Sequence, residues 1–193
     1  MSISISSINY CPVKSISFQS IKSCEILKNI GIVGDRIFAF SKGLDFNQAQ
    51  LFEKKLEERR GKWNKILTLK NSPSLNKYNF LFDNDKLTLT QNNKEILTIN
   101  IDETSEYELL SNKILELESS LQKPIYLMKN KDVPFFDTSI SNKTILNHSI
   151  SLINTKSVED FQNKTNQEIE TQRFRGNIFF DGVDSWEERN WIG

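Results

Sequence analysis

Strict alternation of apolar and polar residues recurs along the chain, over residues 2–6, 86–90 and 97–101. Successive side chains of a β-strand point to opposite faces, so this period of two predicts three half-buried strands. Residues 91–94 separate the last two segments, and their asparagines accept left-handed backbone conformations, which predicts a hairpin. Residues 83–85 predict a second turn, after residues 78–82, so this region is expected to form a meander.

Further short strands are expected at residues 37–40, 66–70 and 125–128. Apolar residues at helical spacing predict a helix over residues 105–121, ended by Pro124. Its apolar stripe consists of Tyr107, Leu110, Ile114, Leu117 and Leu121. A second helix is expected over residues 47–60, with a solvated face of mixed charge. A third is expected after Thr155 or Ser157 as N-cap, with Val158 and Phe161 directed inward.

Many strands with two or three helices predict an α+β fold that is predominantly β. Exposed strand edges are unfavourable, and closing a sheet into a barrel removes them. We therefore expect barrel-like architecture that is incomplete in the C-terminal part of the chain. Residues 129–147 show no periodicity and predict a long connecting loop.

Charge and composition argue against several classes of protein. The 25 Lys and Arg residues balance 25 Asp and Glu residues, so the chain lacks the positive charge that drives nucleic-acid binding. No signal-peptide pattern and no apolar stretch of about 18 residues occurs. We therefore expect no nucleic-acid partner, no membrane partner and a cytoplasmic location. One histidine and two separated cysteines, Cys11 and Cys24, do not form a zinc-binding pattern, so no metal ligand is assigned.

Four short patterns contain the candidate ligand-binding residues. They are Cys11-Pro12-Val13-Lys14-Ser15, Gly31-Ile32-Val33-Gly34-Asp35-Arg36, Ser149-Ile150-Ser151-Leu152-Ile153-Asn154 and Arg173-Phe174-Arg175-Gly176-Asn177-Ile178. Taken singly, each also has a purely structural interpretation, such as a turn at Lys14 or a local ion pair between Asp35 and Arg36. Arg175 and Asn177 alternate along an expected strand, so both would point to one side of a sheet.

Together, in this order, the four patterns resemble the MOSC family, named for the C-terminal domain of molybdenum cofactor sulfurase. Residues 1–125 resemble the MOSC N-terminal β-barrel domain found in many members, including the mitochondrial amidoxime-reducing component and its bacterial relatives. Residues 126–193 resemble the first part of the MOSC domain itself. The segments 181–183 and 185–193 extend the likeness to the last residue.

The resemblance implies that the chain binds the molybdenum cofactor (molybdopterin), a pterin dithiolene that carries a phosphate, in a cleft between the two domains. The positions that match the family's cofactor-binding motifs are Lys14, Ser15, Arg36, Phe174, Arg175 and Asn177, with Ser149, Ser151 and Asn154 as further candidates. These residue types suit an anion. Arginine pairs two phosphate oxygens at once, lysine supplies a compact charge, and serine and asparagine can meet pterin heteroatoms.

The C-terminus departs from the family pattern. In the family, a cysteine beyond the Trp-x-Gly-like segment holds the molybdenum, whereas this chain stops at Gly193. Neither Cys11 nor Cys24 falls at that position, so no catalytic or metal-ligating residue is assigned. Because Trp186 and Trp191 are large apolar groups close to a terminus, we expect the chain to be a truncated form of a longer protein.

At family level the resemblance implies a molybdenum-dependent oxidoreductase that reduces N-hydroxylated compounds. Such an enzyme needs a small-molecule substrate and an electron-donor protein of the ferredoxin- or flavin-type reductase kind. The resemblance also implies two other possibilities. One is a sulfur carrier that uses the family cysteine missing from this chain. The other is the pyridoxal-phosphate binding that is attributed to the family through related sulfurases. The alternative is a non-catalytic module that binds an anionic pterin or phosphate, or an inactive fragment. A serine hydrolase is disfavoured because His148 directly precedes Ser149, and adjacent side chains do not normally face each other.

Overall fold

The computed structural model describes residues 2–136 and 150–191. This part of the chain contains eleven β-strands in four separate sheets and four α-helices, which confirms a mixed α and β fold. The described residues form no closed barrel. The barrel predicted for residues 1–125 does not close here because its strands are short and divide among separate sheets. Within the described ranges, no helix has the length and apolar character needed to span a membrane.

The predicted meander is confirmed as an antiparallel sheet. Its strands are β6 (Tyr78–Asp83), β7 (Lys86–Gln91) and β8 (Lys94–Asn100). Asn84 and Asp85 at the first turn, and Asn92 and Asn93 at the second, all have positive φ. Paired residues of this type give the tight turns whose twist matches that of the flanking strands. The local turn residues therefore set the register of this sheet.

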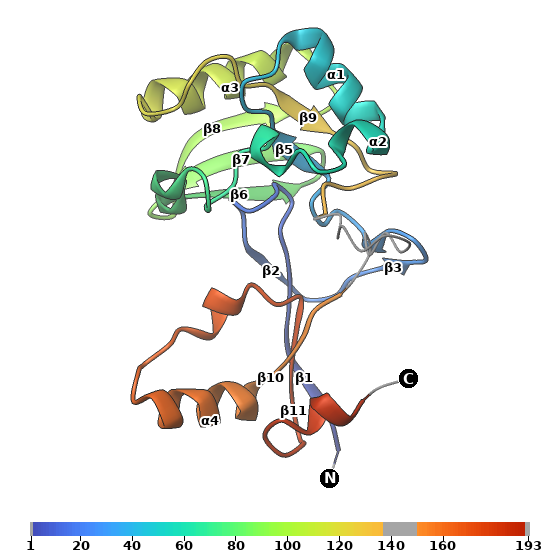
Figure 1. Ribbon diagram of the computed structural model, residues 1–193, viewed down its shortest axis with the longest axis vertical. Helices are drawn as coiled ribbons and strands as arrows, with labels where there is room; N and C mark the ends of the chain where they lie inside the picture. Colours follow the sequence, from blue (N-terminus) through green and yellow to red (C-terminus); the bar gives the residue numbers. More distant parts are fainter. Residues whose placement is uncertain (1, 137–149, 192–193) are drawn as a thin grey trace.

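The main core lies between the meander and helix α3 (Ser105–Leu117), which crosses above it in Figure 1. Leu110 and Ile114, from the predicted apolar stripe, are fully buried in this core. Strand β5 (Phe38–Phe40) pairs with β9 (Leu127–Lys129) and adds two phenylalanines to the same cluster. The 105–121 helix is thus confirmed, although it ends at Leu117.

The helix predicted over residues 47–60 is divided into α1 (Phe46–Lys54) and α2 (Leu56–Arg59). Extended backbone at Lys55 separates them. Two 3₁₀ helices follow, at Trp63–Lys65 and Pro73–Lys77. The strand predicted at residues 66–70 is wrong, because the chain turns away after one isolated bridge between Ser41 and Ile66.

A second sheet, in strand order β10-β11-β1-β2, forms the lower part of the molecule in Figure 1. Its strands are β1 (Ser4–Tyr10), β2 (Gln19–Ile21), β10 (Leu152–Asn154) and β11 (Ile178–Asp181). β11 pairs antiparallel with β1 and parallel with β10. A small hairpin of β3 (Ile26–Leu27) and β4 (Gly31–Ile32) projects to one side. β1 pairs with β11, and β5 pairs with β9. In each pair the first strand comes from residues 1–125 and the second from residues 126–193, so the two predicted domains share sheets.

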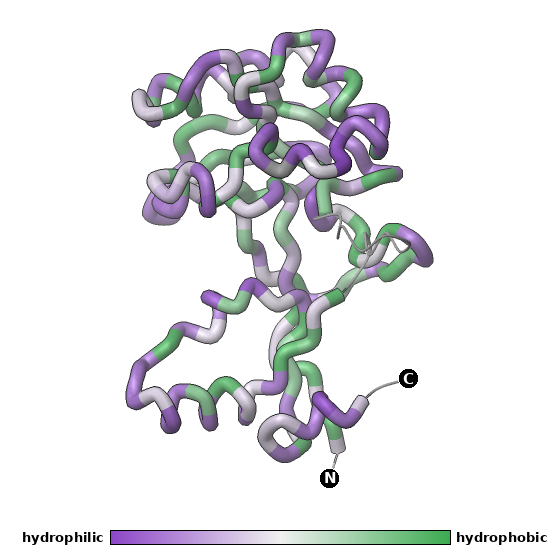
Figure 2. Tube along the Cα trace, in the orientation of Figure 1, coloured by the Kyte–Doolittle hydropathy of each residue, from purple (hydrophilic) through white to green (hydrophobic). Residues whose placement is uncertain are grey.

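Two predictions for this lower part need correction. The start of β1 is not half-buried, because the side chains of Ile3 and Ile5 are 57% and 60% exposed. Helix α4 (Thr155–Thr165) has Asn154 as its N-cap, and Phe161 is exposed rather than directed inward. Two 3₁₀ helices, Thr171–Phe174 and Glu187–Asn190, flank β11. Figure 2 shows hydrophobic stretches along the strands of this sheet, and two of their apolar residues, Ile5 and Leu152, are exposed.

Glu118, which ends helix α3, should make a pH-dependent contribution to stability. Its buried carboxylate lies 2.5 Å from Nζ of Lys77 and accepts a hydrogen bond from Tyr78 Oη at 3.0 Å. Burial raises the pKa of Glu118, but hydrogen bonds from Lys77, Ser74 and Tyr78 outweigh burial and hold the pKa below its usual value. A carboxyl with a lowered folded-state pKa stabilises the protein above its unfolded pKa of about 4.3, and this contribution is lost as the pH falls.

Glu118→Gln is therefore expected to lower the free energy of unfolding by about 1 kcal/mol at pH 7. The difference from wild type should shrink as the pH falls from about 5 to about 3, as measured by urea unfolding. Glu116→Gln, at an exposed position of the same helix, serves as the control and should change stability by less than about 0.5 kcal/mol. A Glu118→Gln difference that does not vary with pH would contradict the role given to the carboxylate.

Candidate functional site

Residues 11–17, here called the junction segment, follow β1 and connect the two parts of the molecule. Val13 forms a parallel bridge with Phe38 of β5, and the backbone N–H of Lys14 donates to the Phe38 carbonyl at 2.8 Å. Val13 and Ser17 are fully buried, and Lys14 is only 3% exposed. The hydroxyl of Ser17 contacts both the N–H and the carbonyl of Val13, which closes the segment into a tight turn.

Arg36 approaches the junction segment from the loop after β4. Its backbone N–H donates to the Cys11 carbonyl at 2.7 Å, and its guanidinium forms an ion pair with the neighbouring Asp35. The same guanidinium lies 4.9 Å from the ring centre of Phe136, and the side chain remains 21% exposed. Gly34 has a φ of +87°, and a Cβ there would lie 3.1 Å from the Tyr10 ring. Glycine therefore allows this loop to pack against the end of β1.

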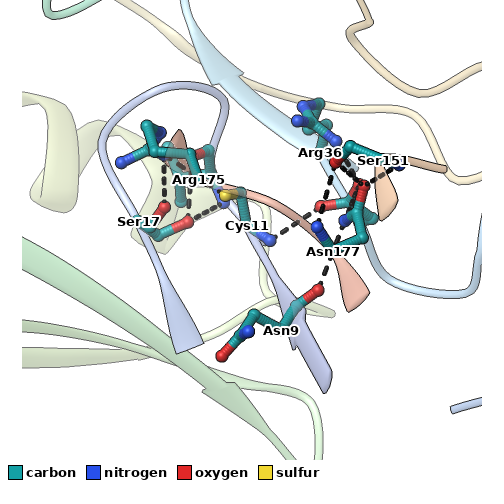
Figure 3. A network of polar contacts seen from close by, with 9 residues as sticks. Asn9, Cys11, Ser17, Arg36, Ser151, Arg175 and Asn177 are labelled. Carbon is teal, nitrogen blue, oxygen red and sulfur yellow. Dashed lines mark hydrogen bonds and ion pairs between the residues drawn. The ribbon is translucent and has the colours of Figure 1, made fainter. Parts of the chain in front are cut away.

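Arg175 approaches the same segment from the loop before β11. Its Nη2 donates to the Ser17 carbonyl at 2.7 Å and to Sγ of Cys11 at 3.2 Å (Figure 3). A Cβ at the following Gly176 would lie 2.3 Å from Cγ1 of Ile153, so only glycine lets this loop pack so closely against β10. Arg36 and Arg175 thus both contact Cys11, although they are far apart in the sequence.

Asn177 is the centre of the polar network drawn in Figure 3. Its Nδ2 donates to the Asn9 carbonyl at 3.2 Å and to Asp35 Oδ2 at 3.3 Å, while its Oδ1 accepts from the Ser151 hydroxyl at 3.0 Å. The side chain is buried, and its contacts join β1, Ser151 directly before β10, and the Arg36 loop. Asn177 therefore fixes the three segments that carry the candidate residues.

Asp35 is a buried carboxylate that orients Arg36. It is 1% exposed and accepts a hydrogen bond from the Cys11 backbone N–H at 2.7 Å. Burial raises the pKa of Asp35 above its usual value, while the Arg36 charge and the hydrogen bonds from Cys11 and Asn177 oppose this rise. Because desolvation penalises an ionised group, the carboxylate depends on these partners to stay charged.

Cys11 is poorly placed to be a metal ligand. Burial raises the pKa of its thiol, and the nearby Arg175 and Arg36 charges only partly oppose this effect. A metal-binding cysteine must be a thiolate, whereas a buried thiol with a raised pKa stays protonated at neutral pH. In the described ranges there is also no group of three or more His, Cys, Asp or Glu residues that could hold a metal ion.

Unusual backbone conformations coincide with the candidate residues. Ten described residues other than glycine have positive φ, and six of these are Asn or Asp, which adopt this conformation most readily. The other four are Ser15, Arg36, Arg175 and Trp186, with φ of 64°, 55°, 50° and 69°. Three of these four residues belong to the predicted binding set. Left-handed residues of these types cost roughly 1–3 kcal/mol each and cluster at functional sites.

Most of the predicted site residues lie together at the junction. Six of them belong to the junction segment or to the loops and strand that contact it, namely Lys14, Ser15, Arg36, Arg175, Asn177 and Ser151. Phe174 is 44% exposed and packs against Phe161, with ring centres 6.4 Å apart, so it joins a different cluster. Asn154 caps α4 instead. Ser149 and His148 lie outside the described residues.

Two details of the site differ from the prediction. Arg175 and Asn177 do not alternate along a strand, because Arg175 ends a 3₁₀ helix in a left-handed conformation and β11 begins only at Ile178. The local ion pair between Asp35 and Arg36 is confirmed, whereas the roles of Asn9 and Cys11 and the other contacts of Asp35 were not predicted. Asp35 had a signal in its position before Arg36, but its contacts with Cys11 and Asn177 depend on chain segments that are distant in the sequence.

Comparison with models of protein families found no match to this chain, and a search of curated proteins found none at significant similarity. The case for a ligand site at the junction therefore rests on its own residues and contacts.

Asn177→Leu is expected to lower the free energy of unfolding by about 2 kcal/mol, because leucine leaves polar groups on Asn9, Asp35 and Ser151 without their partner. Urea unfolding measures the change. Asn163→Leu, on the exposed surface of α4, is the matched control and should stay within about 0.5 kcal/mol of wild type. Equal effects of the two substitutions would show that the network contributes little to stability.

Proposed function

We propose that the junction binds an anionic, phosphate-bearing ligand, and that this ligand is the pterin of the molybdenum cofactor, as the resemblance to the MOSC family implies. The observation that carries the proposal is that Arg36, through its backbone N–H, and Arg175, through its guanidinium, contact Cys11 from distant segments, both in left-handed conformations. Local turn formation does not require arginine at either position, since asparagine or glycine adopts this backbone more easily.

The donor set suits the anionic part of the cofactor. Arg36 forms its ion pair with Asp35 through Nη1, and Arg175 donates its hydrogen bonds to Cys11 and Ser17 through Nη2. Within the described ranges, no hydrogen bond uses the other guanidinium nitrogens of these two residues, so both retain donors for phosphate oxygens. Ser15 adds a partly exposed hydroxyl beside Lys14. Asp35 keeps Arg36 in place but also reduces the net positive charge.

The metal end of the cofactor has no assigned ligand in the described residues, since the Cys11 thiol is buried and protonated. The residues of the junction would therefore bind and orient the pterin, and the cofactor itself would supply the redox chemistry. At family level we propose molybdenum-dependent reduction of N-hydroxylated compounds, with electrons from a ferredoxin- or flavin-type partner. The second candidate, capture of a pterin phosphate without catalysis, is favoured by the protonated state of Cys11.

The content of the purified protein tests the proposal. The chain is produced with molybdate in a host that makes the cofactor, and pterin phosphate and molybdenum are then quantified per chain. We expect nearly stoichiometric pterin phosphate in wild type and in Arg60→Gln, an exposed control, and much less in Arg36→Gln. Molybdenum bound with the pterin supports the catalytic function, whereas pterin phosphate without metal supports capture. A wild-type protein without pterin phosphate would contradict both.

A further inference from the structure

A separate pocket of about 300 Å³ lies in the lower part of the molecule, beside α4 and β10. Three aromatic side chains, Phe161, Phe174 and Trp186, line it together with Leu152 and Val158. The volume is at the lower end of the range for small-molecule sites, and such sites combine apolar walls with a few fixed polar groups. Arg36 and Arg175 do not line this pocket.

Glu188 provides one anionic group in this apolar pocket. Its carboxylate accepts hydrogen bonds from Asn154 Nδ2 at 2.9 Å and from Ser157 Oγ at 2.7 Å. Both donors belong to side chains that are at least nine-tenths buried, and both make further contacts, with the Asp184 carbonyl and the Trp186 N–H. The carboxylate is thus held in one position by neutral groups of β10 and α4.

Glu188 forms no ion pair within the described residues, and the charge of Arg189 acts on it only at longer range. No lysine or arginine nitrogen of that part lies within 4.0 Å of Glu188. Arg189 instead lies over the Trp186 ring, 4.6 Å from its centre, and Lys164 pairs with Asp160 at 2.7 Å. Burial raises the pKa of Glu188, but the hydrogen bonds from Asn154 and Ser157, together with a smaller effect of the Arg189 charge, outweigh burial and lower it, so the group is ionised at neutral pH.

We propose that this pocket binds a small organic amine, with its protonated amino group against Glu188 and its apolar body against Phe161 and Phe174. An ionised carboxylate at the edge of an apolar pocket attracts a cationic group, and its partly buried position makes this attraction stronger than in bulk water. Aromatic walls suit an aryl or alkyl group and also attract a cation. The site is distinct from the junction, so the proposal is independent of the pterin proposal above.

Titration of the purified chain with 2-phenylethylamine and with the neutral 2-phenylethanol tests this site. The two probes differ mainly in charge, and isothermal titration calorimetry gives both affinities. We expect the amine to bind about tenfold more tightly than the alcohol, from one charge-assisted hydrogen bond. In Glu188→Gln this preference should disappear while the affinity for the alcohol is unchanged. Glu187→Gln, at an exposed neighbouring position, should keep the preference.

Equal affinities of wild type for the two probes, or no binding of the amine at millimolar concentration, would overturn the proposal. An amine preference that survives in Glu188→Gln would also overturn it. If that variant does not fold, the salt dependence of binding to the wild-type protein still tests the proposal. Added salt should weaken binding of the amine but not of the alcohol. Arg36→Gln should leave amine binding unchanged, which separates this site from the junction.

Discussion

Arg59→Met is expected to lower the free energy of unfolding by about 3–5 kcal/mol. Arg59 is 4% exposed, and its guanidinium donates to four backbone carbonyls. The acceptors are the carbonyls of Phe52, Glu53, Val133 and Pro134. Methionine fills similar volume but leaves these carbonyls without a donor in a buried region.

The position of Arg59 explains the size of this effect. Its guanidinium lies 4.0 Å from the ring centre of Phe135, and burial lowers the pKa of the side chain to about 10. The residue therefore stays charged at neutral pH and joins helices α1 and α2 to residues 133–135, directly before Phe136, which contacts Arg36. Loss of Arg59 should consequently also weaken ligand binding at the junction.

Urea unfolding followed by circular dichroism measures the loss of stability. The control is Arg60→Met, which changes the adjacent but exposed arginine and should stay within about 0.5 kcal/mol of wild type. Similar stabilities of the two variants would contradict the role assigned to Arg59.

The second large effect is expected on ligand affinity when both junction arginines are replaced. Arg36→Gln and Arg175→Gln should each weaken binding of an oxidised pterin phosphate about tenfold, since each removes charge-assisted hydrogen bonds to phosphate. The double variant should lose about 100-fold or more, because the two side chains approach the ligand from different loops. Fluorescence titration of the pterin measures these affinities.

The dephosphorylated pterin is the matched ligand for this experiment. It should bind weakly to wild type and to all three variants, because it lacks the group that the arginines recognise. Added salt should weaken binding of the phosphate form more than that of the dephosphorylated form. Equal losses for the two ligands would show that the substitutions disturb the fold and not an anion site.

The parts of the fold that could be predicted depend on local signals. The meander follows from alternating residues joined by Asn-rich turns, and helix α3 follows from apolar spacing that buries Leu110 and Ile114. In both cases residues that are close in the sequence determine the structure. The break at Lys55, by contrast, divides a continuous helical pattern, because Arg59 turns back to contact the carbonyls at the end of α1.

The rest depends on contacts between distant segments. Ile3 and Ile5 alternate as half-buried residues would, but their exposure depends on what packs against β1, which the pattern itself does not contain. The candidate site was partly predictable, since Arg36 and Arg175 stand in recognisable motifs. The Asp35 and Asn177 network was not, because it forms only when β1, β10 and two loops meet.

Backbone amide signals of the ¹⁵N-labelled chain, recorded by NMR while the pterin phosphate is added, give the most direct view of the junction. If one ligand contacts both arginines, the signals of Arg36 and Arg175 will move along a single binding curve with one Kd. Movement of only one of them, two different Kd values, or changes confined to residues far from Cys11 would contradict a shared anion site.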